Sequence, residues 1–235
     1  MRICRQILIV LLFFIATRTL GQHEISVNSI NPTGFAKPRA FGLAVGAGTS
    51  RFKVTNSNWK QGTINYNDSL NSITSKSGFK FDVSLLYFIN FNQTFAFRPT
   101  ITVSFTEDKI LYNKFRLDET IDASTVSGTA SLPILFKFRS KSVQPFIVAG
   151  PSFSFVLGQD DKGKNFLPLK KVDLLGDIGF GIDIDIPKWI VITSPEIKYS
   201  SGFLNRKEEA NNLYTNTIEQ LKRRTFTFTI YMRDR

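Results

Sequence analysis

Apolar and polar residues alternate along successive segments of about ten residues, from residue 41 to residue 233. In one such segment Phe79 and Phe81 fall on one side, while Lys80 and Asp82 fall on the other. A period of two residues is typical of a β-strand, because successive side chains point to opposite faces of a sheet. The pattern therefore predicts a protein built from strands that have one apolar and one polar face.

Eight segments of this kind are separated by connections of two lengths. The expected strands are 41–54, 77–88, 94–106, 128–139, 143–157, 171–185, 189–200 and 224–233. Long connections at 55–76, 107–127, 158–170 and 201–223 alternate with short ones at 89–93, 140–142 and around Pro187 and Lys188. A closed antiparallel barrel in a membrane has tight turns on one side and admits long loops on the other. We predict an all-β fold, a closed antiparallel transmembrane β-barrel of about eight strands with short periplasmic turns and long extracellular loops.

The alternative is a soluble β-sandwich or lipocalin-like barrel, whose apolar face would point inward. The one-sided loop lengths favour the membrane, as do the 23 Phe residues, many of them near strand centres on one face. Tyr87, Trp189 and Tyr199 stand near strand ends, where aromatic girdles are expected. In the last long connection, Ile218 and Leu221 also fit a short amphipathic helical turn.

The first residues have the pattern of a secretory signal. Arg2 and Arg5 precede an apolar run at 7–15 that is too short to cross a bilayer as a helix, and small residues follow it. We expect cleavage near Gly21, with cleavage after Ala16 as the alternative. The expected domains are a signal peptide (1–21), a periplasmic leader (22–40) and an outer-membrane barrel (41–235). The expected location is the bacterial outer membrane.

An eight-stranded barrel has an interior only wide enough for side chains, so we expect no diffusion pore. The polar strand faces place charges of both signs inside it: Lys80, Asp82, Arg98, Lys137, Arg139, Asp177, Asp183, Asp185, Glu196 and Lys198. Buried charges must pair, because an unpaired one costs on the order of several kcal/mol. We expect a structural network of lumenal ion pairs, with a register across the Pro187 turn that sets Asp177 opposite Lys198.

The polar residues do not indicate a catalytic site or a cofactor-binding site. Asp183 and Asp185 stand two apart on one strand face, as a carboxylate pair could, but lumenal ion pairing is the favoured interpretation. His23 is the only histidine, and no metal-ligand cluster, phosphate loop or nucleophile elbow is visible. We expect no enzymatic activity, no metal and no cofactor.

The net charge of +11 indicates contact with anionic surfaces. No recognition helix or basic cluster is visible in the sequence, so nucleic acid is not an expected partner. The expected partners are outer-membrane lipid and lipopolysaccharide.

Segments spread over most of the chain resemble one known family. They are 97–101 (FRPTI), 130–140 (ASLPILFKFRS), 146–151 (FIVAGP), 177–183 (DIGFGID), 195–200 (PEIKYS) and 214–222 (YTNTIEQLK). These segments resemble the PorT-like family of outer-membrane barrels, which is associated with type IX protein secretion and gliding motility. The resemblance implies an integral outer-membrane barrel required for export of cargo with a C-terminal sorting domain. It implies an accessory and not the main conduit, and it brings no catalytic residues.

We therefore expect a non-enzymatic accessory or assembly component of type IX secretion, with other secretion components as partners. The leader, with Lys37 and Arg39, is a candidate periplasmic contact. The alternative is a general surface or envelope barrel that binds external ligands through its loops and has no role in secretion. A third hypothesis, a membrane-embedded enzyme, requires that substitution of Asp183 or Ser194 abolish a turnover without unfolding the barrel.

Overall fold

The computed structural model describes residues 38–56, 70–114, 118–138, 143–159, 167–186, 191–208 and 218–234. The chain divides into two compact units, 1–34 and 35–235, and every described residue belongs to the second. The expected signal peptide, nearly all of the expected leader, Arg139 and the turn at Pro187 and Lys188 lie outside the described residues. Among the described residues, no helix is long and apolar enough to cross a membrane.

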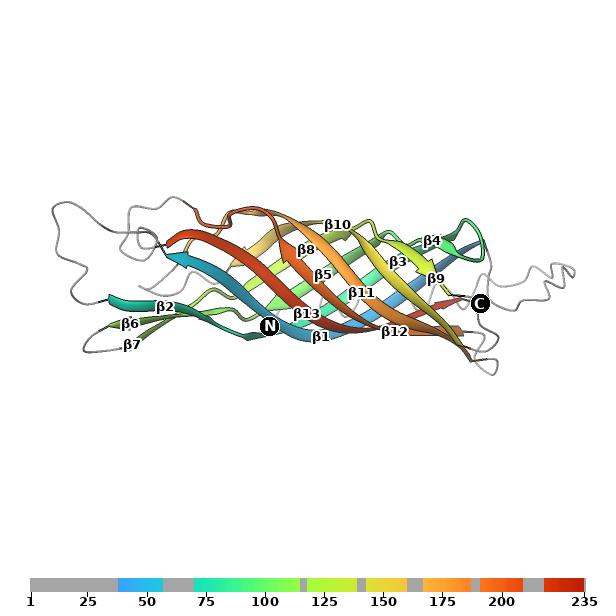
Figure 1. Cartoon of the computed structure of the whole chain (residues 1–235), viewed down its shortest axis with the longest axis horizontal. Coiled ribbons are helices and arrows are strands. Elements are labelled where there is room, and N and C mark those ends of the chain that lie inside the picture. Colours follow the sequence, from blue (N-terminus) through green and yellow to red (C-terminus); the bar gives the residue numbers. More distant parts are fainter. Residues whose placement is uncertain are drawn as a thin grey trace, which may run out of the picture. The chain divides into compact units, whose positions relative to one another are not determined.

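Thirteen strands in two sheets account for most of the described residues. They are β1 (Arg39–Asn56), β2 (Leu70–Lys76), β3 (Gly78–Asn90), β4 (Phe95–Phe97), β5 (Thr100–Thr106), β6 (Lys109–Lys114), β7 (Asp118–Asp122), β8 (Thr125–Ser131), β9 (Ile134–Lys137), β10 (Val143–Gln159), β11 (Val172–Ile186), β12 (Val191–Gly202) and β13 (Ile218–Asp234). Ten of them form one sheet with the order β1-β13-β12-β11-β10-β8-β5-β3-β4-β9. This sheet closes into a barrel, because β1 pairs with both β13 and β3 (Figure 1).

Two wall strands of the barrel are each interrupted at a proline. Pro99 separates β4 from β5, and Pro133 separates β8 from β9. Proline has no N–H to donate to a sheet, so regular pairing stops there. The gap is bridged where the backbone N–H of Arg98 donates to the carbonyl of Pro133 at 3.1 Å. With each interrupted pair counted as one strand, the barrel has eight antiparallel strands, which confirms the predicted fold class.

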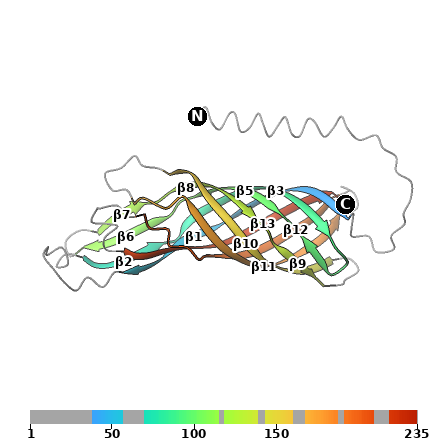
Figure 2. The same ribbon diagram turned by 90° about the horizontal axis from the view of Figure 1, so that it is seen from above.

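The wall of the barrel is apolar outside and polar inside. Phe41, Ile101 and Ile178 are 59%, 66% and 57% exposed, whereas the buried set includes Asp183 and Glu196. A soluble sandwich or lipocalin-like barrel would have the opposite arrangement, with its apolar face turned inward. The strands also run obliquely around a common axis, as closure of a sheet requires (Figure 2). The membrane interpretation of the alternation is therefore the one that the burial pattern supports.

The two ends of the barrel differ in their connections. Short connections at 91–94, 138–142 and 187–190 lie at one end, which we call the turn end. The long connections lie at the opposite end, which we call the loop end. At the loop end, β2, β6 and β7 form a second, three-stranded sheet that extends the wall (Figure 1).

This second sheet lies within connections that the sequence analysis treated as loops. Its strands carry Ser, Thr, Asn and Asp at many positions, which hides their apolar face. That face consists of Ile73, Ile110, Tyr112 and Ile121, each at most 6% exposed. The tips of these connections lie outside the described residues.

The expected helical turn at Ile218 and Leu221 is wrong, because both residues belong to β13. Residues three apart normally face opposite sides of a strand, which made a helical period plausible. Here the register shifts between Thr55 and Asn56, which pair with Gln220 and Ile218. The bulge absorbs Glu219, so Ile218 and Leu221 both point inward.

Candidate functional site

Asp183 is the centre of the lumenal charge cluster at the turn end. Ser194 Oγ donates to Asp183 Oδ1 at 2.5 Å, and Arg233 Nη2 donates to Oδ2 at 2.7 Å. Lys137 Nζ lies 3.7 Å from the same Oδ2 and also donates to Asn90 Oδ1 at 2.8 Å. These groups come from β3, β9, β11, β12 and β13, so the cluster joins distant parts of the wall. A carboxylate held by two cations and a hydroxyl is a structural group rather than a free base.

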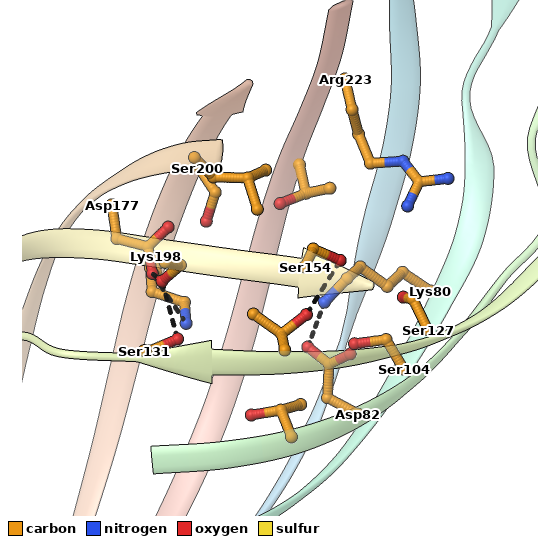
Figure 3. Close-up of a pocket in the computed structure, with 15 residues that line it drawn as sticks. Lys80, Asp82, Ser104, Ser127, Ser131, Ser154, Asp177, Lys198, Ser200 and Arg223 are labelled. Carbon is orange, nitrogen blue, oxygen red and sulfur yellow. Dashed lines mark hydrogen bonds and ion pairs between the residues drawn. The ribbon is translucent and has the colours of Figure 1, made fainter. Parts of the chain in front are cut away.

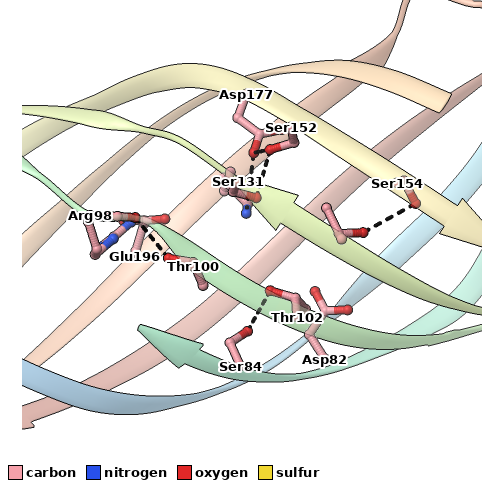
Figure 4. Close-up of polar contacts among 12 residues, drawn as sticks. Asp82, Ser84, Arg98, Thr100, Thr102, Ser131, Ser152, Ser154, Asp177 and Glu196 are labelled. Atoms are coloured by element: carbon pink, nitrogen blue, oxygen red, sulfur yellow. Dashed lines mark hydrogen bonds and ion pairs between the residues drawn. The ribbon is translucent and has the colours of Figure 1, made fainter. Parts of the chain in front are cut away.

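Glu196 is the centre of a second cluster, and it lies two residues beyond Ser194 on β12. Arg98 Nη2 donates to Glu196 Oε2 at 2.5 Å (Figure 4). The Tyr231 hydroxyl donates to Oε1 of the same carboxylate at 3.2 Å. The Arg98 guanidinium also stacks over the Tyr231 ring at 3.9 Å from its centroid. Arg98 stands at the proline interruption, where the chain leaves regular pairing and sends this side chain across the lumen.

Aromatic rings pack against these charges at the turn end. The Phe88 ring lies 3.8 Å from the Arg233 guanidinium and 4.4 Å from Lys137 Nζ. Cations over aromatic faces gain stabilisation that is largest where water is excluded. The turn-end apolar cluster comprises Ala40, Ala44, Leu86, Phe88, Ala96, Leu135, Phe146, Val148 and Tyr231. Together the ion pairs and this cluster close the turn end.

The middle of the lumen contains a polar cavity of about 40 Å³ (Figure 3). Its lining combines hydroxyl groups with Lys80, Asp82, Asp177, Lys198 and Arg223. Lys80 forms an ion pair with Asp82, and Lys198 Nζ lies 3.6 Å from Asp177 Oδ2. A cavity of this size holds on the order of three water molecules, since one water needs roughly 10–15 Å³.

Serine hydroxyls complete the lining beside Asp177. Ser152 Oγ donates to Asp177 Oδ2 at 2.5 Å and lies 2.7 Å from Ser131 Oγ (Figure 4).

Lys198 also lies near the Asp177 carboxylate, although the predicted register between β11 and β12 is wrong. Asp177 pairs with Ser200, and Lys198 pairs with Gly179, so the strands are displaced by two residues. The displacement keeps both side chains on the inner face, and the ion pair forms diagonally.

The loop end is closed differently. Arg223 Nη2 donates to Asp108 Oδ2 at 3.1 Å and to Thr125 Oγ1 at 3.0 Å. Arg206 Nη1 lies 3.8 Å from Asp173 Oδ2, and no hydrogen bond to its guanidinium is found among the described residues. Burial and the neighbouring Arg223 lower the pKa of Arg206 to about 10, which leaves it charged at neutral pH.

Above these pairs lies the loop-end apolar cluster. It comprises Phe52, Ile73, Ile110, Tyr112, Ile121, Ala123, Leu167, Leu169, Ile218 and Leu221, with Val54 packed against it. The second sheet supplies four of these side chains, so the extension of the wall encloses an apolar core of its own.

Most of the sequence-predicted lumenal residues face the interior. Asp82, Arg98, Lys137, Asp177, Asp183 and Glu196 are buried, and Lys80, Asp185 and Lys198 are partly buried. Arg139 lies outside the described residues. Within the described part of the chain, no group of three His, Cys, Asp or Glu side chains is placed to hold a metal ion.

Several lumenal partners were not identified from the sequence: Asp108, Arg206, Arg223, Tyr231 and Arg233. The alternation of apolar and polar residues along β13 indicates that three of them, Arg223, Tyr231 and Arg233, face inward. Phe226, Phe228 and Ile230 are exposed, so the odd-numbered residues of this strand face inward.

The model of a family described as outer membrane protein beta-barrel domain matches residues 22–208. Among solved structures, Neisserial surface protein A is 12% identical, with 81% of this chain and 95% of that chain covered and a TM-score of 0.45. Outer membrane protein OprG from Pseudomonas aeruginosa is 13% identical, with 83% and 93% covered and a TM-score of 0.45. The outer membrane enzyme PagL is 11% identical, with 81% and 97% covered and a TM-score of 0.43. No curated protein matches the chain.

Proposed function

The chain belongs to the outer membrane protein beta-barrel domain family, and from this premise we propose that it is a non-enzymatic accessory of type IX protein secretion. The secretion role is supported by the resemblance of segments such as 130–140 and 214–222 to PorT-like barrels. The role as an accessory is supported by the closed interior, which is the observation that carries the proposal.

A conduit for folded cargo needs an open lumen, and the described interior offers none. The turn end is filled by ion pairs and the apolar cluster around Phe88, and the loop end by the cluster around Leu221. The cavity between them holds only a few waters. Such a barrel acts through its surfaces: the periplasmic leader and turns, the lipid-facing wall, or the loops.

The absence of an enzymatic role is part of the proposal. Asp183 and Ser194 are the pair that a hydrolase hypothesis would use, and they form a hydrogen bond with each other. Arg233 and Lys137 hold the same carboxylate, which opposes its action as a general base. We expect Ser194→Ala to preserve function wherever the barrel still assembles.

Deletion of the gene tests the proposal. We expect proteins with a C-terminal sorting domain to accumulate in the periplasm, while outer-membrane proteins that use other routes stay at normal levels. Complementation with the full chain should restore surface delivery, and complementation with Ser194→Ala should restore it equally. Unchanged surface delivery after deletion would overturn the secretion role.

The second candidate function is a surface barrel that binds external ligands through its loops. The observation that favours it is the β2-β6-β7 sheet, which carries the wall beyond the main barrel at the loop end. Replacing residues 109–122 by a short turn separates the two candidates, with heat-modifiable electrophoretic mobility as the check on assembly. Under the secretion proposal, export survives this change. If export is intact in the deletion strain, and adhesion is lost both there and in this variant, the ligand-binding function replaces it.

A further inference from the structure

The outward faces of β1 and β13 carry four cations at the loop end. Arg51 is paired directly opposite Arg224, and Lys53 directly opposite Lys222. Arg51 and Lys53 are exposed, and Lys222 and Arg224 are partly exposed. We call these four residues the cationic ladder. The sequence alone does not indicate this cluster, because two of the cations are in the first wall strand and two are in the last. These strands become neighbours only when the barrel closes.

Like charges in this arrangement repel each other. Side chains directly opposite on antiparallel strands have Cβ atoms about 5 Å apart, and like charges at such positions destabilise a sheet. None of the four side chains has an ion pair or hydrogen bond to any other residue in the described ranges. The ladder therefore concentrates four positive charges without a protein counter-charge there.

A third pair of opposed cations, this one on the second sheet, shows how the protein can relieve such repulsion. Lys76 is opposite Lys109, and Lys109 Nζ lies 4.0 Å from Asp122 Oδ1 on the next strand. The cationic ladder has no such carboxylate among the described residues. Solution or a ligand can supply the counter-charge that these described residues do not.

The ladder continues directly into the apolar wall of the same two strands. The next outward pairs toward the turn end are Thr49 with Phe226, Ala47 with Phe228, Val45 with Ile230 and Leu43 with Met232. These pairs extend over about 20 Å along the strands, at roughly 3.4 Å per residue. With the outward-facing Phe41 included, the outward face of β1 from Phe41 to Thr49 is about 27 Å long, and a strand tilt of about 40° lowers its height to about 21 Å, close to the apolar band of about 25 Å in an outer-membrane barrel. The cations thus stand at the level where lipid headgroups begin.

We propose that the cationic ladder binds the phosphate groups of an anionic glycolipid of the outer leaflet, whose acyl chains lie along Phe226 and Phe228. Charge complementarity selects the phosphates, and the adjacent apolar rows select a lipid rather than a soluble anion. The site is independent of the lumen and of the secretion proposal. It adds a defined lipid-binding position on one side of the barrel.

The test uses the full chain purified in a zwitterionic detergent and titrated with bisphosphorylated lipid A, with bound lipid counted by native mass spectrometry. We expect Arg51→Gln combined with Arg224→Gln to weaken binding by at least about tenfold, and Lys53→Gln combined with Lys222→Gln to do the same. Dephosphorylated lipid A should bind the native protein as weakly as it binds these variants. Heat-modifiable mobility verifies that each variant is folded.

The matched control removes two exposed cations elsewhere at the loop end. Lys170→Gln combined with Lys171→Gln changes the net charge by the same amount but lies beside β11, two strands from β13. We expect lipid A affinity to stay within about twofold of the native value. An equal loss in the control, or equal binding of dephosphorylated lipid, would overturn the proposal in favour of diffuse electrostatic attraction.

Reversing the charge at one position of the cationic ladder should stabilise the lipid-free protein and remove its stabilisation by lipid A. Arg51→Glu places a carboxylate opposite Arg224, which should raise the thermal midpoint of the lipid-free protein because the repulsion becomes an attraction. The same change should abolish the additional stabilisation that lipid A gives the native protein. A variant that keeps the lipid-dependent shift would overturn the proposal. Inorganic phosphate at the same concentration should give no shift, and a shift equal to that of lipid A would identify the ladder as a free-anion site instead.

Discussion

The two ends of the lumen are both closed, but by different physical means. At the turn end, Asp183 and Glu196 accept hydrogen bonds of 2.5–3.2 Å from Arg98, Ser194 and Tyr231, and Arg233 binds Asp183 at 2.7 Å. At the loop end, one buried pair, Arg223 with Asp108, is hydrogen-bonded at 3.1 Å, but Arg206 stands 3.8 Å from Asp173 without a hydrogen bond to its guanidinium in the described ranges. Most of the filling at this end comes from the apolar cluster around Leu221.

The difference shows what each kind of closure requires. Short charged hydrogen bonds fix geometry and tolerate no loss of a partner, because the remaining charge stays buried. Apolar packing is less directional and tolerates change in proportion to the volume removed. The turn end is therefore the rigid end of this barrel, and the loop end is the end where the wall can be altered gradually.

The largest expected effect is at Asp183. Asp183→Ala leaves Arg233 and Lys137 buried without their carboxylate, and should lower the free energy of unfolding by about 3–5 kcal/mol. Urea-induced unfolding from lipid vesicles measures the change. Asp122→Ala is the matched control, because that carboxylate is 68% exposed and should matter little. A cost at Asp183 of less than about 1 kcal/mol would contradict a turn end locked by charge.

Truncation at the loop end should cost less and in graded steps. Leu221→Ala removes a fully buried side chain from the loop-end cluster and should cost about 2–4 kcal/mol. Ile110→Val, in the same cluster, removes one methylene and should cost about 0.5–1.5 kcal/mol. The same unfolding assay measures both. If the smaller truncation proves as costly as the larger, closure at this end is not governed by packing.

Coupling energies compare the two ends directly. A double-mutant cycle on Arg98→Met and Glu196→Gln should give a coupling of about 2–4 kcal/mol, because the contact is short, buried and hydrogen-bonded. The same cycle on Arg206→Met and Asp173→Asn should give less than about 1 kcal/mol, since the two groups form no hydrogen bond. Equal couplings would show that the two ends are closed by the same means.

The sequence predicted the eight wall strands because lipid imposes a strict alternation on them. It could not choose the register between β11 and β12, because a displacement of two residues keeps every side chain on its own face. The strands β2, β6 and β7 were missed for a related reason. They extend the wall at the loop end, beyond the apolar band, where the outward face need not be apolar and the alternation weakens.

The sequence predicted the acidic residues of the lumenal clusters, but it did not indicate all of the side chains that bind them. Asp183 and Glu196 follow from strand parity, as Arg233 does once Phe226 and Phe228 are placed outward. Arg206 stands outside any strand, so no periodicity indicates that it is buried. The cationic ladder depends on the pairing of the first and last wall strands, which only closure of the barrel brings together.

The smallest expected effect concerns the ion pair on the outside of the loop end. Lys109 and Asp122 are 46% and 68% exposed, with Nζ and Oδ1 4.0 Å apart. Lys109→Met should change the free energy of unfolding by less than about 0.5 kcal/mol, because an exposed pair is screened by solvent. The change also removes the repulsion with Lys76, which offsets part of any loss. Measured in the same urea assay beside Leu221→Ala, a cost comparable to that truncation would mean that even an exposed ion pair holds the loop end as strongly as packing does, and the contrast between the two ends would disappear.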